Sequence, residues 1–192
     1  MLMHGFLWSE TSMLIERNRC QLLLVDMQTG LAPAMTNIAE TTNACCILLE
    51  AAREVGIPVV ISEQYPKGLG RTLPALAEIA QTDERFEKVE FSCFANPELR
   101  TRLNSGDRNQ TIIAGMEAHV CVLQTALEMS AAGCRVFVVA DAVTSRRPDS
   151  KSLALQRMSA AGIDIVSTEM VLFEWLRSAA VPEFKQFSRM IR

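Results

Sequence analysis

The chain has 192 residues, a formal net charge of −3 and hydrophobic side chains at 49% of its positions. This length suits one α/β domain, and this share of apolar residues can fill a core on both faces of a sheet. The mildly acidic balance includes no run of Lys and Arg, which argues against nucleic acid or an anionic membrane as a partner. No apolar stretch is long enough to span a bilayer.

Residues 1–12, MLMHGFLWSETS, fit no regular element and lack the basic start and long apolar run of a signal peptide. We expect them to form a disordered tail, and Met13 could be the true start. Residues 13–192 are expected to form a single domain, because they contain no repeat, low-complexity tract or linker.

Apolar runs alternate with segments of helical periodicity along that domain. In chain order we expect a strand at 20–26, helix at 37–55, strand at 57–62, helix at 73–80, strand at 86–91, helix at 97–103, strand at 110–115, helix at 118–132, strand at 135–140, helix at 148–161, strand at 163–166, and helices at 169–177 and 182–191. Gly56 and Gly133 mark helix ends, and Pro148 occupies a favoured first turn.

This alternation predicts an α/β fold with a six-stranded, mainly parallel sheet and helices on both faces. Right-handed crossovers favour the doubly wound order 3-2-1-4-5-6. Ligands of such sheets bind at the carboxyl ends of the strands, where the order reverses between strands one and four. Asp26 closes the first strand and Cys121 opens the helix after the fourth, so the fold would bring these distant residues together.

Six cysteines and two histidines are present, but no CxxC pair occurs. Zinc-binding spacing is therefore absent, and we expect no metal or other cofactor. Most of the cysteines lie in apolar stretches, where a free thiol behaves as a small hydrophobic side chain. We infer a reducing compartment, the cytoplasm.

Cys121, Asp26 and Lys88 each allow a functional and a structural interpretation. A thiol in the first turns of a helix gains thiolate character and can attack a carbonyl carbon, or it can simply pack against the sheet. A carboxylate at the switch point can move protons, or it can cap a turn. Lys88 could hold that carboxylate and depress the thiol pKa, or be a solvated charge on an edge strand.

His119 stands two residues before Cys121, a spacing that points the two side chains apart on a regular helix. It therefore suits a structural role or the wall of a substrate pocket. Gly68-Leu69-Gly70 lacks the third glycine of a dinucleotide fingerprint and is interpreted as a flexible loop near the pocket. Arg146 and Arg147 could meet an anionic substrate, although we favour solvation.

Three segments in order, LLLVDMQTGL, EKVEFSCF and GMEAHVCVLQTAL, resemble the isochorismatase-like hydrolases, and EQYPKGLG resembles their small single-domain subgroup. The resemblance runs from about Ile15 to the C-terminus. It implies the doubly wound fold already inferred and a catalytic triad of Asp26, Lys88 and Cys121. It also implies a cis peptide bond between Met116 and Glu117.

The resemblance further implies an oxyanion hole made by the backbone N–H groups of Glu117 and Cys121. Leu31, Gln64, Tyr65 and His119 are the expected substrate-binding residues. Nicotinamidases of this superfamily carry an Asp and His metal cluster, whereas the corresponding loop here, Glu63-Gln64-Tyr65-Pro66, contains no His. The predicted activity is metal-independent cysteine hydrolysis of an amide-like C–N bond in a small metabolite, through a thioester.

Two alternatives stay open. The chain could be a scaffold or binding protein with little turnover, or a vinyl-ether hydrolase that uses Asp26 and Lys88 without the thiol. The resemblance also implies a homo-oligomer, a dimer or larger. Phe173, Trp175, Leu176, Phe184 and Phe187 would either contribute to its interface or pack on the sheet.

Overall fold

The computed structural model describes residues 14–191, and the tail expected at residues 1–12 lies outside them. Six parallel strands form one sheet in the order β3-β2-β1-β4-β5-β6, which confirms the predicted topology. The strands are β1 Cys20–Val25, β2 Val59–Gln64, β3 Arg85–Lys88, β4 Gln110–Met116, β5 Arg135–Thr144 and β6 Asp164–Val166. The central strands β1, β2 and β4 are buried along their whole length, as their continuous apolar runs predict.

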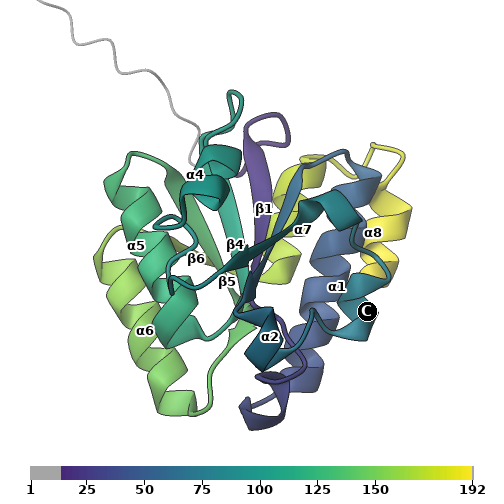
Figure 1. Ribbon diagram of the computed structural model, residues 1–192. Coiled ribbons are helices and arrows are strands. Elements are labelled where there is room, and N and C mark those ends of the chain that lie inside the picture. Colours follow the sequence, from purple (N-terminus) through teal and green to yellow (C-terminus); the bar gives the residue numbers. More distant parts are fainter. Residues whose placement is uncertain (1–13, 192) are drawn as a thin grey trace, which may run out of the picture.

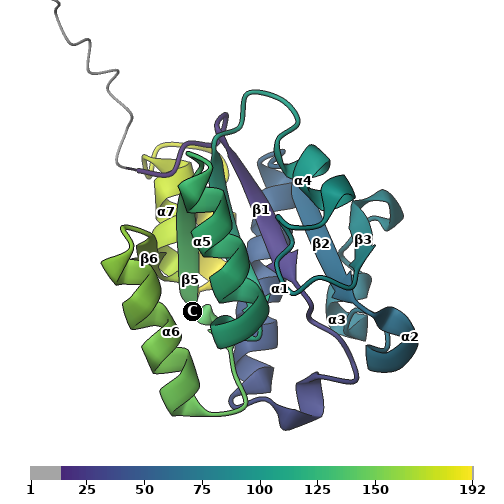
Figure 2. The same cartoon turned by 60° about the vertical axis from the view of Figure 1, so that its left-hand side comes forward.

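Helices cover both faces of the sheet (Figures 1 and 2). One face carries α1 Ile38–Glu54, α7 Thr168–Leu176 and α8 Phe184–Met190, and the other carries α4 Pro97–Leu103, α5 Leu123–Ala131 and α6 Pro148–Ala160. Short helices α2 Pro66–Leu69 and α3 Pro74–Ala77 lie between β2 and β3, together with a 3₁₀ turn at Thr82–Glu84. A second 3₁₀ turn, Ala32–Ala34, follows β1. Within residues 14–191, no helix is both long and apolar enough to cross a membrane.

Two apolar clusters fill the space between the sheet and its helices. One contains Leu22, Leu48 and Trp175, and the other contains Leu23, Met129 and Met158. Leu22 and Leu23 are successive residues of β1 that point to opposite faces. The sheet is therefore packed on both sides, and the carboxyl ends of its strands are the edge left for chemistry.

Strand β5, expected at 135–140, extends to Thr144, and three other segments also differ from the expected elements. The strand expected at 86–91 ends at Lys88, because the chain then turns to place backbone carbonyls around the lysine ammonium group. The loop at 66–70 contains helix α2, which begins with a proline at its first turn. The helix expected from Ala118 begins as a π turn, Ala118–Val122, and becomes α-helical only at Leu123.

Gly115 brings β4 close to β1 at the switch point. Its φ is +118°, and a Cβ built on it would lie 2.0 Å from the carbonyl oxygen of Val25. Only glycine fits such an approach. The two strands can therefore present Asp26 and the segment that holds Cys121 on one side of the crevice.

Candidate active site

Asp26 follows β1 directly and has a left-handed backbone conformation, with φ of 49°. Its side chain is fully buried, and Ser62 of β2 contacts both its carboxylate and its backbone N–H. The Ser62 hydroxyl donates to Asp26 Oδ1 at 2.6 Å, and the backbone N–H of Asp26 lies 3.3 Å from Ser62 Oγ. The carboxylate is thus held by the neighbouring parallel strand.

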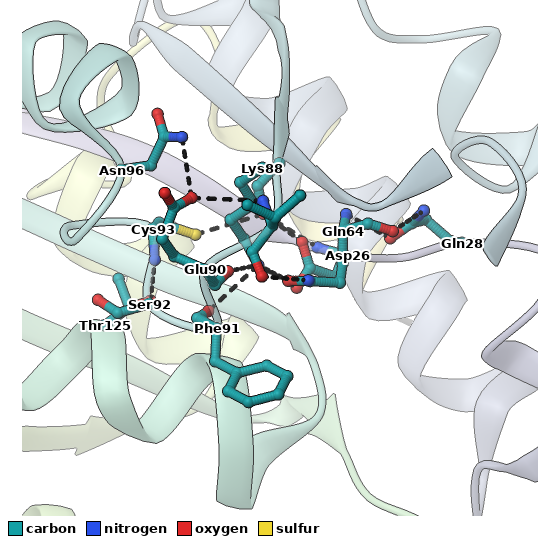
Figure 3. A network of polar contacts seen from close by, with 12 residues as sticks. Asp26, Gln28, Gln64, Lys88, Glu90, Phe91, Ser92, Cys93, Asn96 and Thr125 are labelled. Atoms are coloured by element: carbon teal, nitrogen blue, oxygen red, sulfur yellow. Dashed lines mark hydrogen bonds and ion pairs between the residues drawn. The ribbon is translucent and has the colours of Figure 1, made fainter. Parts of the chain in front are cut away.

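Lys88 ends β3, and its side chain is fully buried like that of Asp26. Its Nζ donates to Asp26 Oδ2 at 2.7 Å and to Gln64 Oε1 at 2.7 Å, and lies 3.2 Å and 3.1 Å from the carbonyl oxygens of Glu90 and Phe91. Figure 3 shows these groups converging on the ammonium. Burial alone would lower the pKa of Lys88, but Asp26, together with Cys93 and Cys121, more than offsets it, and the pKa is raised overall. Lys88 is therefore a permanent cation.

Cys121 lies in the π turn, and only 6% of the residue is exposed. Burial raises the pKa of its thiol, and the negative charge of Asp26 and a hydrogen bond to that carboxyl raise it further. Lys88 acts in the opposite direction with a smaller effect. The expectation of a depressed thiol pKa is wrong for this resting arrangement, because burial and the Asp26 carboxylate together outweigh the lysine. A thiolate can form here only if its proton moves to a nearby base.

Gln64 supports Lys88, and both ends of its amide are engaged. Its Oε1 accepts from Lys88, and its Nε2 donates to the Val89 carbonyl at 2.8 Å. Gln28 in turn accepts from the backbone N–H of Gln64 at 2.7 Å and donates to the Gln64 carbonyl at 3.0 Å. Gln64, expected to bind substrate, is thus occupied in holding the cation, and it reaches substrate only if those bonds break.

The other expected substrate-binding residues lie around the carboxyl edge of the sheet and differ in how exposed they are. Tyr65 is 54% exposed, and its ring lies against Gly68. Leu31 is half-buried beside the 3₁₀ turn after β1. His119 is half-buried, and its Nδ1 lies 3.0 Å from Ser145 Oγ. His119 therefore pairs with Ser145, which agrees with a structural role or a place in the wall of a substrate pocket.

Glu117, whose backbone N–H is expected in an oxyanion hole, is joined to Met116 by a cis peptide bond. Its buried carboxylate accepts two hydrogen bonds from Arg146, at 2.8 Å from Nε and 2.7 Å from Nη2. Hydrogen bonds from Arg146 are the main cause that lowers the pKa of Glu117. The Arg146 side chain stays 61% exposed, as the expected solvation requires, and it also neutralises a buried acid beside the site.

Sequence reasoning missed Ser62, Cys93 and Thr125. Cys93 Sγ donates to Ser62 Oγ at 3.3 Å, and its backbone N–H donates to Thr125 Oγ1 at 2.9 Å. All three residues are buried. Each is a small polar side chain inside an otherwise apolar pattern, which is the one signal that could have singled them out.

Of the hollows near the ends of the strands, two bear on where the site lies. One of about 330 Å³ adjoins the site and is lined by Tyr65, Pro66, Lys67, Glu87, Lys88, Val89 and Asn96. The other, of about 470 Å³, lies at the amino ends of β4 and β5, between Asn109 and Arg135. The Asp26–Lys88 pair lies at the carboxyl edge, where this fold class binds ligands, so we place the chemistry there. In residues 14–191 no group of three or more His, Cys, Asp and Glu side chains could hold a metal ion.

Comparison with known proteins agrees with this fold. Isochorismatase domain-containing protein 2 from Danio rerio is 35% identical over 170 residues, spanning 88% of this chain and 85% of that protein. The structure of MAR1 ribonuclease from Caenorhabditis elegans matches with a TM-score of 0.86 and 33% identity, covering 92% of this chain and 91% of that one. YcaC from Pseudomonas aeruginosa, solved with hexane-2,5-diol and covalent acrylamide, matches with a TM-score of 0.88 and 26% identity, covering 95% and 92%.

A model of the isochorismatase domain matches residues 20–170. That range contains Asp26, Lys88 and Cys121 together with the whole sheet. The chain belongs to the isochorismatase family of hydrolases.

Proposed function

We propose that this protein is a metal-independent cysteine hydrolase that cleaves an amide-like C–N bond in a small metabolite. The single observation that carries the proposal is the buried Asp26–Lys88 pair, 2.7 Å apart, whose carboxylate also reaches the thiol of Cys121. A buried ion pair contributes little net stability compared with apolar packing. Its presence beside a buried thiol therefore supports a catalytic role.

In the proposed reaction Asp26 accepts the proton of Cys121, and the resulting thiolate attacks the carbonyl carbon. Backbone N–H groups of Glu117 and Cys121 stabilise the oxyanion, each contributing about 3 kcal/mol. As the C–N bond breaks, Asp26 donates its proton to the leaving amine, and a thioester remains. Asp26 then removes a proton from water, whose attack breaks the C–S bond. The acid leaves, and Cys121 recovers a proton from Asp26.

Lys88 keeps its charge through the cycle, because its raised pKa leaves the ammonium group protonated near neutral pH. Its positive charge offsets the negative charge that passes between Asp26 and Cys121. One relative, YcaC, was solved with covalent acrylamide, a reagent that reacts with nucleophiles such as thiols. This supports a nucleophilic role for the family scaffold.

A vinyl-ether hydrolase that uses Asp26 and Lys88 without the thiol is the second candidate. The observation in its favour is the raised pKa of Cys121, which keeps the thiol protonated at rest. A scaffold with little turnover is the third alternative. One structural relative is named as the MAR1 ribonuclease, which adds RNA to the substrates worth testing.

The deciding experiment is acid-quenched mass spectrometry of the intact protein during turnover of a panel of small primary amides. We expect an acyl adduct on Cys121 in the wild-type protein and neither adduct nor turnover in Cys121→Ala. Cys46→Ala, which removes a half-buried thiol on α1, is the matched control and should behave as wild type. Turnover retained in Cys121→Ala would overturn the thioester route and favour thiol-independent chemistry.

We also propose a cytoplasmic location and a homo-oligomeric state. The six cysteines are free thiols, which suits a reducing compartment. Of the residues expected at an interface, Trp175, Leu176 and Phe187 are core residues. Phe173 stays 42% exposed on α7 beside Met170, which is 54% exposed. These two side chains are the apolar surface that supports assembly.

A further inference from the structure

Ser62 lies between the proposed general base and a second buried thiol. Its hydroxyl donates to Asp26 Oδ1 at 2.6 Å and accepts from Cys93 Sγ at 3.3 Å. Ser62 and Cys93 are both fully buried. Figure 3 shows Cys93, Asp26 and Lys88 in one polar network, although Cys93 plays no part in the proposed reaction.

The geometry fixes the direction of these hydrogen bonds. A serine hydroxyl has one proton to donate and two lone pairs that accept. Ser62 Oγ lies 3.3 Å both from the thiol of Cys93 and from the backbone N–H of Asp26, and both of these groups are donors. The Ser62 hydroxyl therefore donates its own proton in a hydrogen bond to the Asp26 carboxylate.

Cys93 can fill this place only as a protonated thiol, because a thiolate would draw the Ser62 proton away from Asp26. Burial raises the pKa of the Cys93 thiol to about 11. Cys93 is therefore a permanent donor at neutral pH.

The far end of the chain of bonds is anchored on the helix that follows the nucleophile. The backbone N–H of Cys93 donates to Thr125 Oγ1 at 2.9 Å, and Thr125 belongs to α5, four residues after Cys121. The chain of contacts thus runs from α5 through Cys93 and Ser62 to Asp26. It ties the position of the carboxylate to the element next to Cys121.

We propose that Ser62 and Cys93 form a hydrogen-bond relay that holds the Asp26 carboxylate in the orientation needed to exchange a proton with Cys121. Ser62 holds Oδ1 while Lys88 holds Oδ2 at 2.7 Å, so the carboxyl group cannot rotate. Both residues are positioning residues, since they act through Asp26. The inference rests on the proposed function, in which Asp26 is the base.

The test measures alkylation of Cys121 by iodoacetamide across pH, with each cysteine quantified by mass spectrometry. The acid limb of this profile reports the proton uptake that removes the Cys121 thiolate, in a site where Cys121 is coupled to the Asp26 carboxylate. A hydroxyl that donates to a carboxylate favours the deprotonated group. Its loss in Ser62→Ala should therefore move the acid limb upward by about one pH unit.

Ser62→Thr keeps the hydroxyl and should keep the limb at its wild-type position. Cys93→Ala should shift the limb in the same direction by less, and Cys93→Ser, which retains a donor, should restore it. An unchanged limb in Ser62→Ala, or equal shifts in Ser62→Ala and Ser62→Thr, would overturn the relay while leaving the proposed function intact. A wild-type Cys121 that shows no acid limb and reacts as slowly as Cys45 would overturn the proposed function and the relay together.

Discussion

At the scale of single residues, the candidate site is built around one buried ion pair. Asp26 and Lys88 have no exposed side-chain surface. The carboxylate accepts a hydrogen bond from Ser62 of a neighbouring strand, and the ammonium donates to carbonyls of the following loop, which compensates for burial. Breaking such a pair leaves one charge buried without compensation. The same two residues therefore affect stability and the proposed activity.

We expect Lys88→Met to lower the free energy of unfolding by about 3–5 kcal/mol, because Asp26 stays buried without its cation. The double variant Asp26→Asn with Lys88→Met removes both charges and should regain part of that loss. Urea denaturation at neutral pH measures the difference. If Lys88→Met alone were as stable as wild type, the buried Asp26 carboxylate would not depend on the charge of Lys88, and the prediction would be wrong.

Glu63 supplies the pH dependence that can be tested at this scale. Burial by itself would raise its pKa, but hydrogen bonds from Thr72 and Arg71 more than offset it, and the pKa is lowered. A carboxyl whose pKa falls on folding stabilises the protein above its unfolded pKa, and this contribution is lost as pH falls through the folded value. Glu63 should therefore stabilise the protein at neutral pH and not in acid.

Glu63→Gln should lower stability at neutral pH by about 1–3 kcal/mol, because the two Thr72 donors lose a charged acceptor and Arg71 loses its acceptor oxygen. The deficit should shrink in acid, as judged by urea denaturation at a series of pH values. Glu87→Gln is the matched control, since the exposed Glu87 accepts from the same Arg71. A deficit of equal size for both variants would show that Arg71 alone matters.

At the scale of elements, the site depends on how closely β1 and β4 approach. A Cβ at Gly115 would overlap the Val25 carbonyl, and the φ of +118° disfavours any other residue. The π turn that carries Cys121 begins two residues after β4 ends, so a shift of β4 moves the thiol. Strand pairing and nucleophile placement are therefore coupled.

Gly115→Ala should destabilise the fold by more than about 3 kcal/mol, because the strands must separate to relieve the overlap. Gly133→Ala is the matched control: it also has positive φ, of +89°, but a Cβ there meets no atom within 4 Å. It should cost only about 1 kcal/mol of backbone strain. Thermal unfolding of both variants compares the stability that each one loses. Equal losses would mean that the positive φ, and not the overlap with the Val25 carbonyl, causes the destabilisation.

At the scale of the whole molecule, the sheet separates its two apolar clusters and leaves two exposed apolar side chains on α7. Met170 and Phe173 lie on the outer surface of a helix whose inner side chains, Val171, Leu172 and Trp175, pack against the sheet. The Phe173 ring also contacts Phe184 of α8, with ring centroids 6.4 Å apart. This pair of helices is where we expect a second copy to dock.

We expect light scattering to report a dimer or larger assembly at micromolar concentration, and Met170→Lys with Phe173→Lys to shift it toward monomer. Leu153→Lys is the control, because Leu153 is equally apolar and 66% exposed on α6. A wild-type monomer, or dissociation by Leu153→Lys alone, would count against α7 as the interface.

Periodicity and strand order could be predicted from the sequence because they depend on local patterns of apolar residues. Continuous apolar runs such as residues 20–25 identify buried parallel strands, and Asp26 at the end of one run marked the carboxyl edge. The place of Cys121 after the fourth strand made it a candidate as well, and the resemblance in three short segments joined it with Asp26 and Lys88 as a triad. These inferences need no knowledge of distant contacts.

The tertiary structure alone decided how the site is supported and charged. Ser62, Cys93 and Thr125 are small polar residues from three elements, and nothing local says that they contact Asp26 or one another. The direction of the thiol pKa likewise depends on burial and on a carboxylate 95 residues away along the chain, whose charge outweighs that of Lys88. The local pattern of apolar residues determined which strands form and where they end. Hydrogen-bond partners and desolvation determined what the residues at those ends can do, because both depend on packing in three dimensions.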